Sequence, residues 1–333
     1  MKKITTAATI ALAILLIISC EGNGRYMTIT GYAQGGNYSV TYNSKGARAS
    51  AKEISKGIDS ILTCIDTTLS GYNPGSMLSR YNRGEAVEPS PMFEEIFALA
   101  KELYEHSEGT VDVAAAPLFD LWGFGFTDGS SPSEDTLAKV MANCGMKNFS
   151  GNLRRPQEGQ ALNYNAIAQG YSADKVAEYL RKTGVKDMLV DIGEIFCMGK
   201  SPSGRGWRIA IDTPIDGNMT PGQNTAAIWE SDGGPCGIVT SGNYRKYYMS
   251  DGKKISHTID PRSGRSVSHN LLSATILAED ACTADAIATA CMVMGLEEAK
   301  KFILKNNYEA FLIYSDEEGL MSSWKTGGFN VNQ

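Results

Sequence analysis

Hydrophobic residues recur at helical spacing in two segments of the N-terminal half. From position 51 onward, isoleucine and leucine follow one another at intervals of three and four residues, which gathers their side chains on one face of an α-helix. A second such segment begins at Ser90-Pro91, with proline at the first helical position, and should end at Gly109. The positions expected to face inward are Ile54, Ile58, Ile61, Ile65 and Leu69 in the first helix, and Phe93, Phe97, Ala100 and Tyr104 in the second.

Four further helices are predicted mainly from the residues at their ends. Residues 131–134 form a capping box that opens one helix, and Gly145 closes it. A helix of about 13 residues should follow segment 163–171 and stop at Gly184. The next helix has Thr283 as its predicted N-cap, and the last runs over 296–305.

Segments rich in β-branched and aromatic residues predict the strands. The Asp251-Gly252 pair separates segments 244–250 and 253–258, which is a strong hairpin signal. A closing hairpin is expected over 310–324, and single strands over 27–30, 38–42, 188–192, 207–211, 226–230, 237–241 and 272–278. Strands and helices do not alternate strictly, and no repeat is present. The pattern therefore favours a single α+β domain with mainly antiparallel sheets flanked by helices.

The N-terminus has the pattern of a secretory signal. A basic start at Lys2 and Lys3 precedes an apolar run over 4–18, and Ser19-Cys20 follows it. This site resembles a bacterial lipobox, which would lipidate Cys20 and hold the chain on the periplasmic side of a membrane. A cleaved signal with an incidental cysteine is the alternative. The predicted divisions are a signal peptide over 1–19, a lipidated tether with the first strand over 20–32, a domain over 33–325 and a C-terminal tail over 326–333.

Composition excludes some classes of function. The net charge of −6 argues against a nucleic-acid partner, which would require a basic face. The chain has seven cysteines and three histidines. The six cysteines that follow Cys20 include no Cys-x-x-Cys pair, so a zinc site is not expected. An exported chain could form disulfides, although the spacing identifies no pair. Cys282 and Cys291 are expected to be small core residues.

The clearest candidates for chemistry lie between positions 256 and 289. A strand containing His257 should enter a tight turn that begins at Asp260-Pro261 and ends at Gly264, where positive φ is needed. On the following helix, Asp285 and Thr289 are four residues apart and share one face. A carboxylate and a hydroxyl placed in this way provide two oxygen ligands for Mg²⁺.

Three other segments suggest a ligand site. Segment 69–82 is rich in small and polar residues, so it is either a surface connection or a ligand loop. Trp122 and Phe124 alternate with glycines, which allows contact with a flat ligand, or else the two rings cap the core. Segment 163–171 enters a helix N-terminus, where free N–H groups can bind a phosphate.

Five ordered motifs together resemble the ApbE family of FAD:protein FMN transferases, over about residues 33–325. They are LSGYNPGSMLSRYN at 69–82, VDVAAAPLFDLWGFG at 111–125, NYNAIAQGYSADKV at 163–176, SHTIDPRSGR at 256–265 and TADAIAT at 283–289. LVDIGE and TSGNYRKYY lie between them in the expected order. The resemblance implies the ApbE-like, T-fold-related architecture.

The resemblance also implies an activity and a site. Members of the family bind FAD and Mg²⁺ and transfer FMN to a threonine of a partner protein, releasing AMP. By this resemblance the metal ligands are the Ala166 carbonyl, Asp285 and Thr289, and the catalytic residues are Asp285 and His257, the latter as a base or a phosphate contact. The implied FAD contacts are Gln34, Ser70, Gly71, Tyr72, Asp112, Val113, Ala114, Asn163, Gln169 and Ile259.

Two departures from the family pattern affect how FAD would be held. Asn163 stands where the family usually has aspartate, and Gln169 where it often has lysine. Two alternatives remain: a Mg²⁺-dependent FAD pyrophosphatase that gives FMN and AMP, and a non-catalytic flavin-binding lipoprotein. The retained Asp285, Thr289 and His257 disfavour the second. The implied acceptor is an exported protein with an accessible threonine, such as a subunit of a membrane redox complex.

Overall fold

The computed structural model describes residues 25–126, 131–149, 152–215, 218, 222–243, 247–250 and 253–332. The predicted signal peptide, Cys20 and the Asp251-Gly252 turn lie outside the described residues. None of the helices in these ranges has the length and apolar character needed to cross a bilayer.

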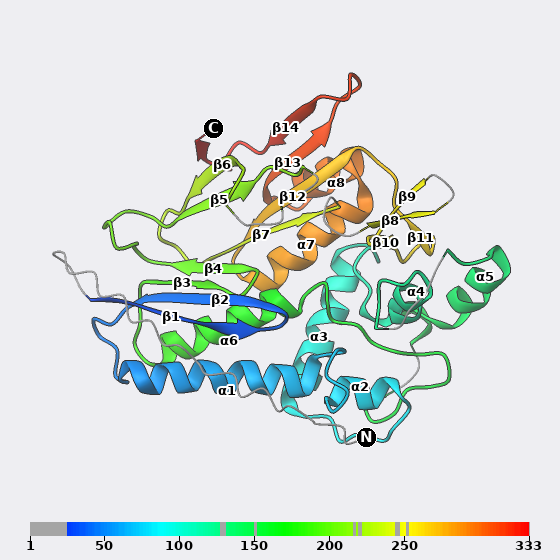
Figure 1. The fold of residues 1–333 in the computed structure, drawn as a ribbon, viewed down its shortest axis with the longest axis horizontal. Coiled ribbons are helices and arrows are strands. Elements are labelled where there is room, and N and C mark those ends of the chain that lie inside the picture. The colour runs from blue at the N-terminus through cyan, green and yellow to red at the C-terminus, as the bar shows by residue number, and fades with distance from the viewer. Residues whose placement is uncertain are drawn as a thin grey trace, which may run out of the picture.

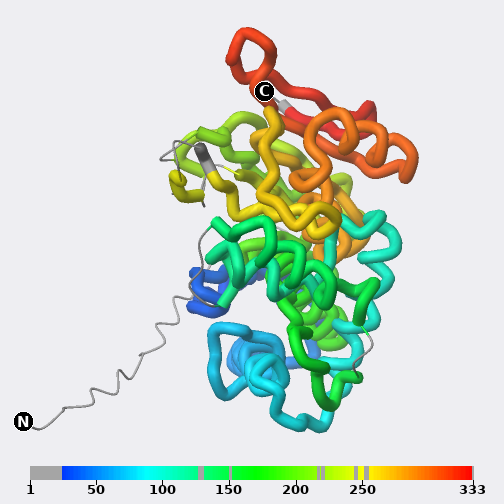
Figure 2. Tube along the Cα trace, turned by 90° about the vertical axis from the view of Figure 1, so that its right-hand side faces the viewer, coloured from blue at the N-terminus to red at the C-terminus, as the bar shows by residue number. Residues whose placement is uncertain are grey.

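An antiparallel sheet of eight strands forms the centre of the described structure (Figure 1). Its order is β1-β2-β3-β4-β7-β12-β13-β14, and all neighbours pair antiparallel, which confirms the expected α+β class. Strands β1 and β14 therefore form the two edges of this sheet, and Figure 2 shows the C-terminal strands, in red, at one end of the molecule. The strands are β1 (Tyr26–Ala33), β2 (Gly36–Asn43), β3 (Met188–Asp191), β4 (Ile195–Met198), β7 (Cys236–Gly242), β12 (Leu271–Ala278), β13 (Glu309–Ser315) and β14 (Met321–Lys325).

Helices cover one face of this sheet. Figure 1 shows α1 and α6 beneath β1–β4, and α7 beside β7 and β12. The α-helices are α1 (Ala51–Leu69), α2 (Met77–Asn82), α3 (Pro91–His106), α4 (Ala116–Leu121), α5 (Glu134–Asn143), α6 (Ala168–Lys182), α7 (Ala281–Met294) and α8 (Leu296–Lys305), with two 3₁₀ turns, η1 (Val113–Ala115) and η2 (Met146–Asn148).

A smaller sheet covers part of the other face. Its order is β15 (Val331–Asn332), β6 (Thr225–Glu230) and β5 (Arg208–Asp212). Successive side chains of β7 point to opposite faces of the central sheet, and each face is covered by a different layer. Ile238 packs toward the smaller sheet, and its neighbour Val239 packs toward α7. Two short pairs complete the described strands, β8 (Tyr247–Ser250) with β9 (Lys253–Ser256), and β10 (Ile259–Asp260) with β11 (Arg265–Ser266).

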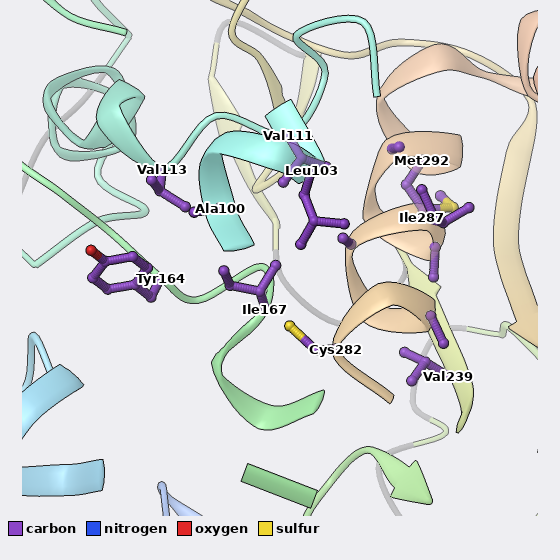
Figure 3. Packing of buried hydrophobic residues seen from close by; sticks show 14 of the residues in the cluster. Ala100, Leu103, Val111, Val113, Tyr164, Ile167, Val239, Cys282, Ile287 and Met292 are labelled. Atoms are coloured by element: carbon purple, nitrogen blue, oxygen red, sulfur yellow. The ribbon is translucent and has the colours of Figure 1, made fainter. Parts of the chain in front are cut away.

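Helix α7 lies in the interior of the domain. Its sequence is apolar around its whole circumference, as expected of a helix buried on all sides, and Asp285 is its only charged residue. Figure 3 shows Cys282, Ile287 and Met292 of α7 facing Ala100 and Leu103 of α3 and Ile167 before α6. A carboxylate is thus placed on a helix that otherwise forms core.

Several predicted elements differ from the structure. Residues 77–82 of the expected loop form α2, which is too short to show helical periodicity and is capped by Ser76. Helix α6 begins at Ala168, inside the polar motif, and is longer than predicted. Asp280 rather than Thr283 is the N-cap of α7, because the Thr283 N–H donates to Asp280 Oδ1 at 2.7 Å. Strand β4 was not predicted.

Two further differences concern burial. On α3, Ile96 and Leu103 are buried, whereas the predicted Phe97 and Tyr104 are only partly covered. In the segment predicted to be a C-terminal tail, Phe329 is fully buried and β15 pairs with β6. The folded domain therefore continues beyond residue 325.

Candidate functional site

A cavity of about 370 Å³ opens where the N-terminal end of α6, one face of α7 and the segment after β9 meet. Most of the predicted site residues line it, although they come from distant parts of the chain. Those that line the cavity are Tyr72, Asp112, Val113, Asn163, Ala166, Gln169, His257, Ile259, Asp285 and Thr289. Gln34, Ser70, Gly71 and Ala114 are not among the lining residues.

The carboxylate of Asp285 is bound to the N-terminal turn of α6. The backbone N–H of Gly170 donates to Asp285 Oδ2 at 3.1 Å. The side chain is buried, with 5% of the residue exposed, and Oδ1 has no hydrogen-bond partner among the described residues. Burial raises the pKa of Asp285, the negative charge of Asp174 adds to this, and the Gly170 N–H opposes it. The site therefore favours a bound proton or a bound cation at this carboxylate.

Asp174 of α6 makes the reciprocal contact. Its two carboxylate oxygens accept from the backbone N–H groups of Ala281 and Cys282, each at 2.8 Å, at the N-terminus of α7. The helices also touch at Gly170, where an added Cβ would lie 2.3 Å from the Ala281 carbonyl oxygen. A carboxylate from each helix thus binds the N-terminal backbone of the other, and this fixes the position of Asp285.

Thr289 and Ala166 add neutral oxygens to the same cavity. Thr289 lies one turn after Asp285, and its Oγ1 is 3.5 Å from Ser241 Oγ. Ala166 precedes α6 and also lines the cavity. Nowhere in the described ranges do three His, Cys, Asp or Glu side chains gather to hold a metal. A cation bound here would therefore depend on one carboxylate, neutral protein oxygens and oxygens of its ligand, a set that suits Mg²⁺.

Asn163 holds the segment before α6 through one hydrogen bond to η1 and one within the segment. The Asn163 N–H donates to the Val113 carbonyl at 2.8 Å, and Asn163 Oδ1 accepts from the Asn165 N–H at 2.9 Å. Gln169 packs over Gly193, whose φ is +89° and where an added Cβ would lie 2.6 Å from Gln169 Nε2. Both departures from the family pattern are therefore side chains with a defined place in the cavity wall.

Asp112 lines the cavity and holds the start of η1 in place. Its carboxylate accepts from the Ala114 N–H at 2.9 Å and from the Met146 N–H at 2.9 and 3.1 Å. Burial raises the pKa of Asp112, and these backbone bonds oppose the shift. Because both carboxylate oxygens are engaged, this side chain shapes the segment 112–114 that borders the cavity.

The loop after α1 contributes an exposed aromatic ring. Tyr72 is 69% exposed and packs edge to face on Phe126, with ring centres 5.1 Å apart. Gly71 makes this contact possible, since an added Cβ would lie 2.0 Å from the Phe126 ring. The Ser70 carbonyl accepts from Ser76 Oγ at 2.6 Å. Ser70 and Gly71 therefore shape the loop, and Tyr72 borders the cavity.

The structure separates the roles of Trp122 and Phe124. Trp122 is buried, and its Nε1–H donates to the Gly264 carbonyl at 2.8 Å, which joins two motifs 142 residues apart in the chain. Phe124 lines the cavity, with its ring centre 6.3 Å from that of His257 and stacked at 5.2 Å on Tyr248. The first ring thus belongs to the core and the second to the site.

Gln34 lies outside the cavity lining. It adopts a φ of +52°, and its Nε2–H donates to Ser172 Oγ on α6. Its Oε1 is buried and lacks a hydrogen-bond partner in the described part of the chain. This contact holds the β1–β2 turn against α6.

Sequence reasoning did not assign several lining residues. Glu194 and residues 240–242 lie in LVDIGE and TSGNYRKYY, which were recognised as ordered segments without assigned roles. Val111, Phe119, Asn165 and Thr258 lie within three of the five motifs but had no assigned role. No sequence signal marked Thr110, Met292 or Val293 as site residues. The unassigned lining residues are Thr110, Val111, Phe119, Asn165, Glu194, Thr240, Ser241, Gly242, Thr258, Met292 and Val293.

Comparison with known proteins gives consistent matches. The model of the ApbE family matches residues 34–312. An FAD:protein FMN transferase from Haemophilus influenzae is 31% identical over 339 residues, which cover 97% of this chain and 96% of the relative. One from Vibrio cholerae is 32% identical and covers 93% and 94%.

Solved structures agree with the sequence matches. The flavin transferase ApbE from Vibrio cholerae superimposes with a TM-score of 0.78 at 30% identity, covering 91% of this chain and 98% of its own. The apo form of the flavinyl transferase ApbE from Pseudomonas stutzeri has a TM-score of 0.78 at 31% identity, covering 94% and 95%. The similarity in both sequence and structure spans nearly the whole chain.

Proposed function

The chain belongs to the ApbE family, and we propose that it transfers FMN from FAD to a threonine of an acceptor protein, in a Mg²⁺-dependent reaction that releases AMP. One observation carries the proposal. The only charged residue of the buried helix α7 faces a cavity that also contains Thr289, Ala166 and His257. A buried carboxylate is costly unless it is fully paired, and the single hydrogen bond from the Gly170 N–H to Oδ2 does not compensate the whole charge of Asp285.

The residues that would hold Mg²⁺ are Asp285, Thr289 and Ala166. Their fit is supported by the unpartnered Oδ1 of Asp285 and by the all-oxygen character of the donor set. When bound, Mg²⁺ would neutralise negative charge on the pyrophosphate oxygens of FAD.

The chain's own residues would orient the substrates and move a proton. Tyr72 and Phe124 present aromatic faces at the cavity for a flat ring system. His257 would accept the proton of the threonine hydroxyl as that oxygen bonds to the FMN phosphorus and the phosphoanhydride bond to AMP breaks. General base catalysis of this kind is worth about 10²–10⁴-fold. The remaining acceleration would come from positioning.

A transfer assay tests the proposal directly. The protein is incubated with FAD, Mg²⁺ and an acceptor domain that has an accessible threonine, and flavin is detected by in-gel fluorescence while nucleotides are quantified by chromatography. The expected result is a fluorescent acceptor with one AMP released per flavin attached. The acceptor with threonine replaced by valine, and a reaction with EDTA, should remain dark.

Two other results would assign a different function. Release of FMN and AMP at the same rate without an acceptor would indicate an FAD pyrophosphatase, with water as the nucleophile. FAD that binds but stays intact under all conditions would indicate a flavin-binding protein.

We also propose that Cys20 is lipidated, that the enzyme is anchored on the periplasmic side of a membrane, and that its acceptor is exported. The support is the sequence pattern of the first 20 residues. Mass spectrometry of the mature N-terminus should find a lipid-modified Cys20. An unmodified N-terminus at any other residue would contradict the proposal.

A further inference from the structure

Cys197 of β4 and Cys236 of β7 lie directly opposite each other in the central sheet. Residues opposed in this way have side chains on the same face and Cα atoms about 4.5–5.5 Å apart. The two cysteines share the face that packs against the smaller sheet, where Cys197 is buried and Cys236 is partly covered. Both are free thiols in the structure.

We propose that Cys197 and Cys236 form a cross-strand disulfide when the chain folds in the presence of a disulfide oxidant. Disulfides join Cα atoms about 4.4–6.8 Å apart, and the spacing of an opposed pair falls within this range. The Cβ atoms of such a pair are about 4.5–5.5 Å apart and would move together by about 1 Å or less. The two thiols lose two protons and two electrons, and the oxidant is reduced to two thiols.

No other pair of described cysteines faces across neighbouring strands. Cys64 lies on α1 and Cys144 at the end of α5. Cys282 and Cys291 both lie on α7, nine positions apart, which separates them by about 13 Å along the helix axis. The spacing of cysteines in the sequence could not single out 197 and 236, because their proximity follows from the pairing of β4 with β7.

Burial determines when the bond can form. The thiolate is the reactive species, and burial raises the pKa of Cys236 to about 12 and that of Cys197 further. Oxidation of the folded, reduced protein should therefore be slow, whereas oxidation during folding meets exposed thiols. Once formed, the bond should be reduced slowly, because burial also limits the access of a reductant to the two sulfur atoms.

The bond would stabilise the domain without entering the reaction. It links β4 to β7 within the central sheet and closes a ring of chain that contains β5 and β6 of the smaller sheet. Restricting the unfolded chain in this way favours the folded state. The cavity residues of β7, 240–242, lie beyond the bond, and neither cysteine lines the cavity. Transfer activity should therefore be the same in the oxidised and reduced proteins.

Refolding under two redox conditions tests the proposal. Denatured protein is refolded either with a glutathione redox mixture or with excess reductant, alkylated, digested without reduction and analysed by mass spectrometry. The oxidised sample should contain a peptide linking Cys197 to Cys236, and its Tm should be about 5–10 °C higher than that of the reduced sample. Folded, reduced protein given the same oxidant should acquire the link at least tenfold more slowly.

Variants identify the pair. Cys236→Ser, at the partly exposed position, should abolish the linked peptide and the difference in Tm between the two conditions. Cys64→Ser, on the exposed face of α1, should change neither. The proposal is overturned if Cys197 and Cys236 are both alkylated after oxidative refolding, if another pair is linked instead, or if the Tm difference persists in Cys236→Ser.

Discussion

The cavity has one side formed by the crossing of α6 and α7 and another formed by loops and the segment after β9, and the two sides are held in different ways. At the crossing, Asp174 and Asp285 bind backbone N–H groups of the opposite helix, and Gly170 brings the two backbones into contact. On the other side, Phe124 and Tyr72 contact neighbouring rings, the Tyr72 hydroxyl accepts a hydrogen bond from Asn165 Nδ2 at 3.1 Å, and Tyr72 is largely exposed.

This difference corresponds to two tasks. Electrostatic stabilisation is effective when the charged group is already in place and need not reorganise, which suits the helix side. A flat ligand that must enter and leave, and an acceptor protein that must approach, suit a side whose aromatic rings have fewer fixed backbone contacts. Changes on the helix side should therefore affect catalysis or stability strongly, and changes on the loop side should mainly affect binding and rate.

The largest effect is expected for Asp285→Ala. It removes the only full charge among the three expected Mg²⁺ ligands, so transfer should fall by about 10³-fold or more. Thr289→Ala should have a smaller effect, because water can replace a neutral ligand. FAD binding and transfer rate are measured across a Mg²⁺ titration, with circular dichroism to confirm folding. Wild-type turnover of Asp285→Ala at low Mg²⁺ would contradict the metal site.

His257→Ala, on the other side, should slow transfer by about 10²–10⁴-fold, as expected for loss of a general base. FAD binding should stay within a few-fold of wild type, since the aromatic rings and the metal ligands remain. Single-turnover transfer and fluorescence titration with FAD separate the two quantities. If affinity fell as much as rate, His257 would be a phosphate contact rather than a base.

Gly170→Ala tests the contact between the helices. The added Cβ would lie 2.3 Å from the Ala281 carbonyl oxygen, a backbone atom that cannot rotate away. We expect a loss of about 1–3 kcal/mol in the free energy of unfolding, with reduced transfer because Asp285 moves. Gly36→Ala is the matched control, as nothing lies within 4 Å of its added Cβ. Equal denaturation midpoints for the two variants would refute tight helix contact.

The pH dependence of stability tests Asp174. Burial raises its pKa from 3.8 to about 7, against the effect of its hydrogen bonds to Ala281 and Cys282. Between these values the folded protein binds more protons than the unfolded chain, so this contribution to the free energy of unfolding falls as pH rises, by at most about 1.4 kcal/mol per pH unit. Burial also raises the pKa of Asp285, which contributes with the same sign.

Asp174→Asn should therefore flatten the fall in stability between about pH 4 and 7. Urea denaturation of the metal-free wild type and variant at several pH values gives the two slopes. Identical slopes would show that the Asp174 carboxyl does not titrate in this range in the folded protein.

The smallest effects should distinguish the two aromatic residues of the Trp122–Phe124 segment. Trp122→Phe removes the hydrogen bond to the Gly264 carbonyl and should cost about 1 kcal/mol of stability while leaving FAD affinity nearly unchanged. Phe124→Leu should instead weaken FAD binding with little change in stability. Urea denaturation and FAD titration of both variants measure the contrast. A reversed pattern would exchange their assigned roles.

The sequence by itself determined the local elements and the chemical types in the site. Long periodic segments such as α1 and α3 were predicted because hydrophobic periodicity is a property of neighbouring residues. The turn at Asp260 and Gly264 was predicted because both residues have strong local preferences, and Gly264 indeed has a φ of +72°. The shared face of Asp285 and Thr289 followed from their spacing alone. Short elements such as α2 and β4 were not predicted from the sequence, because they contain too few residues to show a hydrophobic period.

Only the tertiary structure decided which distant residues meet. The exchange of carboxylate contacts between α6 and α7, the hydrogen bond from Trp122 to Gly264, and the opposition of Cys197 and Cys236 each join positions far apart in the chain. Such contacts arise from how helices pack and which strands pair, and these depend on the whole core rather than on any window of sequence. The ordered motifs could identify the family, but the cavity that brings them together exists only because α7 is buried with its one charge facing the N-terminal end of α6.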